Sequence, residues 1–135
     1  MVRSVAHVCF VVKDLEAAER FYTEVIGLKH AFDFLKETGE RFGVYLHAGG
    51  RTFIELFTGN PAQVAGGSYQ HVCFEVDDVT AAVETIRARG WKVSDATLGS
   101  DDSWQAWVSD PDGNSIELHS YTAGSLQAPW VSERP

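Results

Sequence analysis

An internal repeat runs through this sequence. Residues 7–18 (HVCFVVKDLEAA) and residues 71–82 (HVCFEVDDVTAA) are identical at eight of twelve positions, and the tripeptide Ile-Glu-Leu follows each copy, at 54–56 and at 116–118. Solenoid repeats bury their apolar faces by stacking several copies, and here there are only two. The repeat therefore predicts two equivalent modules and not an array.

Each half is predicted to fold as a strand, a helix and three further strands. In the first half, apolar residues alternate through 7–12, as in a strand, and recur at helical spacing through 15–25, between the N-cap candidate Asp14 and the helix-ending Gly27. The other strands of this half are predicted near 30–35, 41–47 and 51–57. In the second half, a helix over 79–89 is followed by strands near 91–96, 104–109 and 115–120. A turn at 110–114 (DPDGN) joins the last two strands.

This pattern predicts an α+β fold made of two tandem βαβββ modules. At 135 residues and 44% apolar composition, the chain has material for one packed domain and not for two separate ones. We expect a single domain over 1–121, composed of repeat 1 (5–58) and repeat 2 (69–121), with a Gly- and Pro-bearing linker between them. Residues 122–135 lack periodicity and are predicted to form a C-terminal arm.

Composition and charge exclude several classes of protein. A formal net charge of −8 argues against nucleic acid or an anionic membrane as the partner. No apolar run reaches the length of a membrane span, and the N-terminus has no export signal. The two cysteines, Cys9 and Cys73, fit a reducing compartment in which they stay thiols. These features predict a soluble cytoplasmic protein.

Strand alternation places four polar side chains on the faces that no helix covers. With the apolar residues of each strand turned towards a helix, His7, Glu55, His71 and Glu117 face the other way. Taken singly, a strand histidine or glutamate is more often a hydrogen-bonded or solvated residue than a ligand. The duplication favours a site, because both halves keep a histidine on the first strand and a glutamate on the last. If the two sheets curl towards each other, these side chains converge on a ligand set suited to a borderline divalent metal.

Two motifs carry a family resemblance. Residues 14–28 follow the pattern D-L-x-x-A-x-x-F-Y-x-x-x-x-G-L, and residues 110–118 read DPDGNSIEL. With the βαβββ duplication, they resemble the vicinal oxygen chelate superfamily, which includes glyoxalase I, extradiol dioxygenases, methylmalonyl-CoA epimerases and the fosfomycin- and bleomycin-resistance proteins. The resemblance covers about 5–121 and implies paired modules whose sheets curl around a metal-bearing cleft.

The resemblance also implies a ligand set and a reaction. His7, His71 and Glu117 correspond to ligands shared by several branches, and Glu55 corresponds to a fourth ligand that resembles glyoxalase I. This set implies a divalent-metal-dependent lyase or isomerase that acts on a small vicinal-oxygen substrate through a metal-stabilised ene-diolate, with Glu117 or Glu55 as the base. One ion per site is expected, with nickel, cobalt, zinc, iron and manganese not distinguished. Relatives imply a homodimer, in which the ligands come from one chain or from two.

Two positions depart from glyoxalase I. Val11 stands where those enzymes carry an arginine that grips a glutathione carboxylate, and Gly59 stands where an asparagine is expected, with Asn60 adjacent. A neutral side chain cannot replace a bidentate guanidinium, so the substrate is predicted to be another, less anionic, vicinal-oxygen compound. Two alternatives stay open. One is a ferrous extradiol-type dioxygenase that uses His7, His71 and Glu117, and the other is a metal-free drug-binding protein of the bleomycin-resistance type.

Three further residues on these strand faces invite interpretation. Cys9 and Cys73 are interpreted as small neutral core thiols, because buried cysteine usually behaves as a small hydrophobe. His119 lies two residues beyond Glu117 on the same face and is an outer partner of the site, a substrate-facing residue or an ordinary surface residue.

Overall fold

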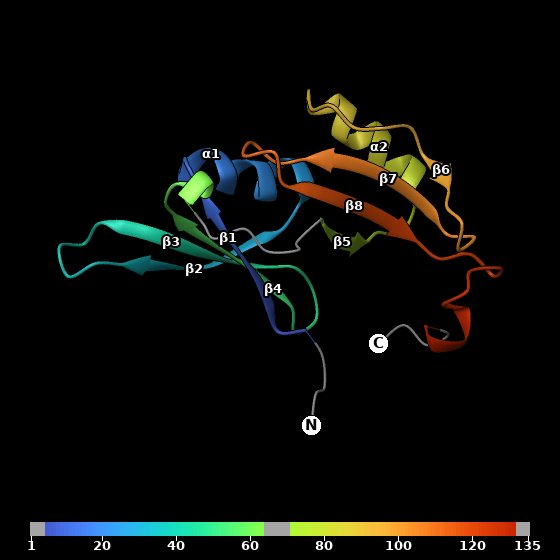
Figure 1. Ribbon diagram of the computed structural model, residues 1–135, viewed down its shortest axis with the longest axis horizontal. Coiled ribbons are helices and arrows are strands. Elements are labelled where there is room, and N and C mark those ends of the chain that lie inside the picture. The colour runs from blue at the N-terminus through green and yellow to red at the C-terminus, as the bar shows by residue number, and fades with distance from the viewer. Residues whose placement is uncertain (1–4, 64–70, 132–135) are drawn as a thin grey trace. The chain divides into compact units, whose positions relative to one another are not determined.

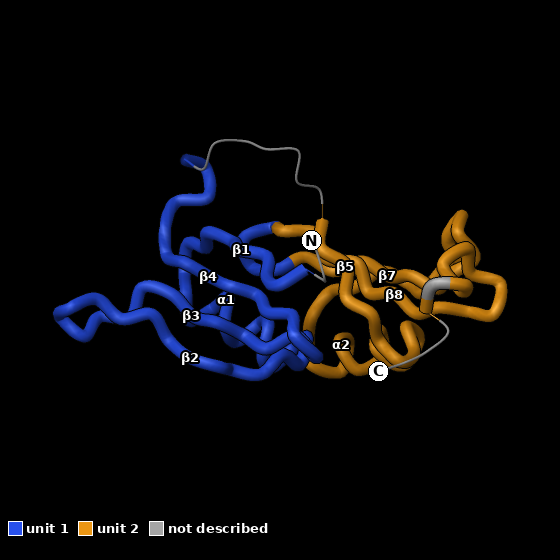
Figure 2. The backbone as a smooth tube through the Cα atoms, turned by 90° about the horizontal axis from the view of Figure 1, so that it is seen from below, with its two compact units in different colours: residues 1–69, 110–113 blue, residues 70–109, 114–135 orange. Residues whose placement is uncertain are grey.

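A computed structural model describes residues 5–63 and 71–131 of the protein. The chain divides into two compact units, residues 1–69 with 110–113, and residues 70–109 with 114–135 (Figure 2). Each repeat supplies the elements of one unit, and only the turn at 110–113 is assigned to the unit of the other repeat. The prediction of a single domain over 1–121 stays a prediction.

Unit 1 contains the first βαβββ module (Figure 1). Its elements are β1 (His7–Val12), α1 (Leu15–Arg20), the π-helix η1 (Phe21–Ile26), β2 (Lys29–Leu35), β3 (Arg41–His47) and β4 (Phe53–Thr58). The sheet order is β1-β4-β3-β2, in which β1 and β4 run parallel and the other pairs antiparallel. The parallel pairing brings the first strand of the repeat against its last.

Unit 2 repeats this arrangement. Its elements are β5 (His71–Glu75), α2 (Val79–Ala88), β6 (Thr97–Leu98), β7 (Trp104–Ser109) and β8 (Ser115–Ser120). The sheet order is β5-β8-β7-β6, again with the first and last strands parallel. The registers are equivalent, since Cys9 is opposite Glu55 in unit 1 and Cys73 is opposite Glu117 in unit 2. The predicted α+β class with two βαβββ modules is confirmed.

Local signals start and end the helices as predicted. Asp14 accepts a hydrogen bond from the Ala17 N–H over 2.9 Å, and Asp78 accepts one from the Ala81 N–H over 3.0 Å. Each carboxylate thereby satisfies a donor that the first helical turn leaves unpaired. The first helix, predicted over 15–25, continues through η1 to Ile26 and ends at Gly27, whose φ of 97° is readily adopted only by glycine.

The predicted strand over 91–96 is wrong. Of that segment, the structure retains a single bridge between Val93 and Val108, and the short strand β6 lies further along, at Thr97–Leu98. Ser94 explains the break, because its hydroxyl accepts the Trp107 N–H over 2.8 Å where a strand backbone would supply a carbonyl. A serine side chain that competes with the backbone ladder is invisible to an apolar pattern.

Each unit packs its helix against one face of its sheet. The buried apolar side chains of the β-strands and helices are Phe10, Val12, Leu15, Ala18, Phe21, Tyr22, Val25, Val44, Leu46, Ile54 and Leu56 in unit 1, and Val79, Val83, Ile86, Ala106, Val108, Ile116 and Leu118 in unit 2. Burying this apolar area stabilises the fold and also fixes strand register, because a shift by one residue would turn every core side chain outward. The opposite faces are therefore set by the same packing, and they carry the polar residues predicted to form a site.

Parts of the linker and of the arm lie outside the described residues. The described linker contains the 3-10 helix η2 (Pro61–Gln63), whereas Gly66 and Gly67 and the start of repeat 2 at 69–70 are not described. The arm is described to residue 131 and includes the 3-10 helix η3 (Ala128–Trp130). None of the helices in the described part of the chain is long and apolar enough to span a bilayer.

Candidate metal centre

In unit 1 the first and last strands bring His7 and Glu55 together. The imidazole Nε2 of His7 lies 4.0 Å from Oε1 of Glu55, and the Glu55 side chain is only 16% exposed. The other ring nitrogen of His7, Nδ1, lies 3.1 Å from the hydroxyl of Tyr45, which is the strand neighbour of Glu55. This contact orients the ring so that Nε2 is the nitrogen facing the carboxylate.

Unit 2 contains the equivalent pair at closer range. Nε2 of His71 lies 3.2 Å from Oε2 of Glu117, whose side chain is 13% exposed. The ring of Trp107 packs edge-on against His71, with centroids 4.9 Å apart, and Trp107 is the strand neighbour of Glu117. In both units, therefore, the histidine contacts a glutamate on the last strand and an aromatic residue on the strand before it.

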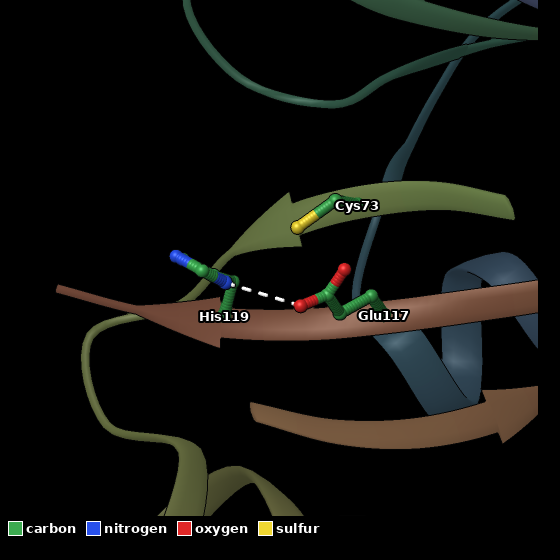
Figure 3. Close-up of side chains that lie close together, drawn as sticks. All are labelled: Cys73, Glu117 and His119. Carbon is green, nitrogen blue, oxygen red and sulfur yellow. Dashed lines mark hydrogen bonds and ion pairs between the residues drawn. The ribbon is translucent and has the colours of Figure 1, made fainter. Parts of the chain in front are cut away.

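His119 makes the second pair different from the first. Its ring is buried, and Nδ1 lies 3.2 Å from Oε1 of Glu117 (Figure 3). Because His71 faces Oε2, each carboxylate oxygen of Glu117 faces an imidazole. Nε2 of His119 lies 3.9 Å from Asp101, and the amide of Gln127 in the arm donates to that carboxylate over 2.6 Å. The Gln127 hydrogen bond lowers the pKa of Asp101, which keeps the carboxylate charged behind His119. The interpretation of His119 as an ordinary surface residue is wrong.

The cysteines lie on the same faces and are exposed, so their interpretation as core residues is wrong. Each unit packs its helix on the opposite face of its own sheet, so that helix does not cover the thiols. Partial burial and the neighbouring Glu55 raise the pKa of the Cys9 thiol to about 11. Burial and Glu117 raise that of Cys73 to about 12. The predicted neutral state of both thiols is consistent with these directions.

Cys73, Glu117 and His119 also form a cluster of metal-ligating types, with ligand atoms within 4.8 Å of one another (Figure 3). A thiol must lose its proton to bind a metal, and the raised pKa of Cys73 opposes this. Imidazole and carboxylate are thus the stronger donors of the cluster. His71 is the other imidazole within reach of Glu117.

A second cluster of metal-ligating types, formed by Glu19, His30 and Asp33, is paired with the side chain of Arg41. Arg41 donates from Nη1 to Glu19 over 2.6 Å and to Asp33 over 3.1 Å. The guanidinium lies between the two carboxylates. The hydrogen bond with His30 is the main cause of the lowered pKa of Asp33, and Arg41 lowers that pKa further. This cluster is an ion-pair network on the helix side of the sheet.

The donors of the two His–Glu pairs fit a divalent metal ion. Each pair offers an imidazole nitrogen and carboxylate oxygens on a helix-free sheet face, which is the donor chemistry of zinc, nickel, cobalt and ferrous sites. The structure brings His7 to Glu55 in one unit and His71 to Glu117 in the other. That the two pairs share one ion stays a prediction.

The residues that support these pairs were not among the predicted site residues. Tyr45 carries a signal in the sequence, because alternation along β3 puts this ring on the helix-free face, opposite Glu55. No strand alternation or other sequence pattern marks Asp101 and Gln127 as neighbours of the site. They lie in a loop and in the arm, and only the tertiary fold brings them behind His119.

Comparisons with known proteins agree with this architecture. The chain is 25% identical over 126 residues to uncharacterized protein YaeR of Escherichia coli (strain K12), an alignment that covers 87% of this chain and 96% of YaeR. It is 32% identical over 123 residues to the probable lactoylglutathione lyase, chloroplastic, of Arabidopsis thaliana, covering 86% of this chain but 35% of the plant protein. Among solved structures, TnmS3, an antibiotic binding protein from Streptomyces sp. CB03234, superposes with a TM-score of 0.74 at 29% identity, covering 90% of this chain and 98% of TnmS3.

The family model described as Glyoxalase/Bleomycin resistance protein/Dioxygenase superfamily matches residues 4–118. This range contains repeat 1, repeat 2 as far as residue 118, and all four predicted ligands, and it confirms the resemblance seen in the sequence. The chain belongs to the Glyoxalase/Bleomycin resistance protein/Dioxygenase superfamily.

Proposed function

We propose that this protein is a divalent-metal-dependent lyase or isomerase of the glyoxalase I type, acting on a small substrate with two adjacent oxygens. The observation that carries the proposal is the repetition of one His–Glu pair in each unit, at 4.0 Å and 3.2 Å, on equivalent strands. A structural role would not require the same two residue types at the same register in both copies. The lactoylglutathione lyase relative supports the reaction type.

His7, Glu55, His71 and Glu117 would hold the ion, either within one chain or between two chains of a homodimer. A bound divalent ion supplies Lewis acidity, which polarises substrate oxygens. In each unit a further side chain orients the ligand set: Tyr45 contacts His7, and His119 contacts Glu117. These contacts restrict the donor atoms to one orientation, as a metal site requires.

Glu117 is the carboxylate that we assign to proton transfer between neighbouring substrate carbons. Its Oε1 is held by the buried His119, and its Oε2 faces His71 at 3.2 Å. We assign Oε2 as the oxygen that accepts and returns the proton. In unit 1, Phe57 stands at the position equivalent to His119, and so Glu55 has no second imidazole there. Glu55 is assigned mainly to holding the ion.

A second candidate function is the binding of a small molecule without chemistry. The likeness to TnmS3, an antibiotic binding protein, favours it, as does the run of aromatic rings that lies beside His7. In this case Glu55 and Glu117 would be dispensable for ligand binding. The two candidates therefore differ in what removal of the carboxylates does.

The test is metal content and metal affinity, read separately from activity. Protein purified without chelator is analysed for bound transition metals, and affinity for Ni²⁺, Co²⁺ and Zn²⁺ is measured on chelator-treated protein. We expect Glu117→Gln and Glu55→Gln each to lose at least tenfold in affinity, since each removes one charged ligand. Glu75→Gln is the matched control, because Glu75 is an exposed carboxylate on the neighbouring strand. Unchanged metal affinity in the Glu55→Gln/Glu117→Gln double variant contradicts the proposal.

Activity is then assayed on the metal-loaded protein. The substrate panel contains hemithioacetals, acyl-CoA thioesters and, after anaerobic iron loading, catechol with oxygen uptake. Turnover of a hemithioacetal or another vicinal-oxygen substrate that Glu117→Gln abolishes supports a lyase or isomerase. Oxygen uptake with catechol instead identifies the ferrous dioxygenase.

A further inference from the structure

Five aromatic rings gather on the helix-free face of the sheet in unit 1, and the ring of a sixth residue, Phe42, packs against two of them. Phe32, Tyr45 and Phe53 stack across strands β2, β3 and β4, with centroids 4.8 Å apart at each step and planes within 27° and 23° of parallel. A second row, Phe34, Phe57 and Phe42, runs beside it, with centroids 4.9 Å and 5.7 Å apart. We call these six residues the aromatic surface. None of the six is fully buried, and Phe32 is 47% exposed.

A glycine is needed to build this surface. Gly43 lies under the ring of Phe57, and a Cβ added there would come within 2.5 Å of that ring. The ring therefore lies flat over the β3 backbone, and any other residue at 43 would lift it. The second row depends on this position, because Phe57 contacts both Phe34 and Phe42.

The aromatic surface is continuous with the His7–Glu55 pair. Tyr45 belongs to the first row, and its hydroxyl lies 3.1 Å from Nδ1 of His7 while its ring packs against the imidazole at 5.7 Å. A molecule that covers the rings of Tyr45 and Phe32 thus has one end at His7 and Glu55. An exposed apolar patch that adjoins a polar donor set is typical of a ligand-binding site.

The two departures from glyoxalase I meet at the other end of the surface. A Cβ added at Gly59 would lie 2.6 Å from Cγ1 of Val11, so Val11 fills the space in which a side chain at 59 would begin. Val11 is also the strand partner of Phe57, which joins this contact to the second row. An apolar contact has replaced two polar positions at once, and it offers no donor to a carboxylate.

We propose that the aromatic surface binds an uncharged, planar aromatic portion of the substrate, and that the Val11–Gly59 contact excludes anionic thiol adducts. This inference rests on the proposed function for the role of His7 and Glu55, and it adds the substrate class. Aromatic rings stack favourably on planar ligands, but they contribute little binding free energy to a flexible peptide that carries carboxylates. A substrate whose two adjacent oxygen-bearing carbons lie next to an aromatic ring satisfies both parts of the site.

Binding of two probes tests this proposal. Naphthalene-2,3-diol is an uncharged aromatic with adjacent oxygens, and S-hexylglutathione is an anionic thiol adduct. Their affinities are measured by calorimetry on protein as purified and again after chelator treatment. We expect the wild type to prefer naphthalene-2,3-diol in both states, and Phe32→Leu to weaken this probe roughly three- to tenfold through the lost ring contact.

Matched variants separate the surface from the rest of the molecule. Trp104→Leu removes an exposed aromatic ring on the sheet of unit 2 and should leave both affinities unchanged. Val11→Arg restores a guanidinium next to Gly59 and should tighten S-hexylglutathione at least threefold without improving naphthalene-2,3-diol. Tyr45→Phe keeps the ring, so it should retain most of the naphthalene-2,3-diol affinity. Circular dichroism confirms that each variant is folded.

The outcomes distinguish this inference from the proposed function. If metal affinity depends on Glu55 and Glu117 but Phe32→Leu leaves the probe affinity unchanged, the metal centre stands and the aromatic surface is overturned. If no metal binds but Phe32→Leu weakens the probe, the surface stands and the lyase proposal fails. A change from dimer to monomer in Phe32→Leu, with probe affinity unchanged, shows that a second copy covers this face and overturns the inference.

Discussion

At the scale of single residues, the two His–Glu pairs occupy equivalent positions but differ in the number of histidines that contact the glutamate. Glu117 lies between His71 and His119, whereas Glu55 has one histidine, at 4.0 Å. A buried imidazole behind a carboxylate restricts its rotation, and residues of this kind contribute to metal affinity without touching the metal. His119 is therefore a positioning residue for Glu117, backed in turn by Asp101.

His119→Leu should weaken the affinity for Zn²⁺ or Ni²⁺ by about 10- to 100-fold, because Glu117 loses the contact that orients it. His119→Asn should retain more of the affinity, since its amide nitrogen can take the place of Nδ1. Both are measured by competition with a chelator of known affinity. Equal losses in the two variants would indicate a packing role for His119 instead.

The thiols provide a test of their surroundings in the metal-free protein. Because the pKa of Cys9 is raised to about 11 and that of Cys73 to about 12, both thiols stay protonated at pH 8, where an unperturbed thiol is partly ionised. We expect alkylation by iodoacetamide at pH 8 to be roughly tenfold slower than in the unfolded chain, and to accelerate as the pH rises. Glu55→Gln should accelerate Cys9 and leave Cys73 unchanged. The alkylation rate of each cysteine is measured by mass spectrometry of the peptide that contains it.

At the scale of elements, strand alternation carried most of the sequence analysis. The apolar helix-side residues of β4 and β8 are buried, as are Phe10 and Val12 of β1, whereas Val8 is only half-buried. Their alternates face away, as predicted, because the core cannot be filled in any other register. The predicted strand over 91–96 does not form, because the hydroxyl of Ser94 accepts a hydrogen bond from the backbone of β7. Periodicity reports burial and not hydrogen-bond partners, and so it could not detect this.

Gly43→Ala tests whether β3 needs a glycine beneath Phe57. The new Cβ would lie 2.5 Å from the ring and 2.9 Å from the Leu56 carbonyl, so the ring must move. We expect a loss of about 1–3 kcal/mol in the free energy of unfolding, measured by chemical denaturation. Gly124→Ala is the control, since its Cβ would meet only ordinary contacts, the nearest at 3.7 Å. In a Phe57→Ala background, Gly43→Ala should cost less, and an undiminished cost there would locate the clash at the backbone.

At the scale of the whole molecule, a ligand bound only by the folded state stabilises that state by mass action. Ni²⁺ or Zn²⁺ at 100 times its dissociation constant should raise the midpoint of thermal unfolding by roughly 5–10 °C. Chelator should reverse the shift, and the Glu55→Gln/Glu117→Gln double variant should show little of it. A shift of the same size in the double variant would indicate that the metal binds elsewhere.

The sequence by itself determined the two βαβββ modules, the helix caps and the strand faces on which the histidines and glutamates lie. These features depend on neighbours a few residues apart or on the period of the apolar pattern, both of which are written locally in the chain. Only the tertiary structure decided that His119 lies between Glu117 and Asp101, that Val11 fills the space beside Gly59, and that Phe57 lies over Gly43. Each of these arrangements includes a contact between residues of different strands or loops. Its geometry follows from how the sheet and the arm pack, and no short-range pattern encodes it.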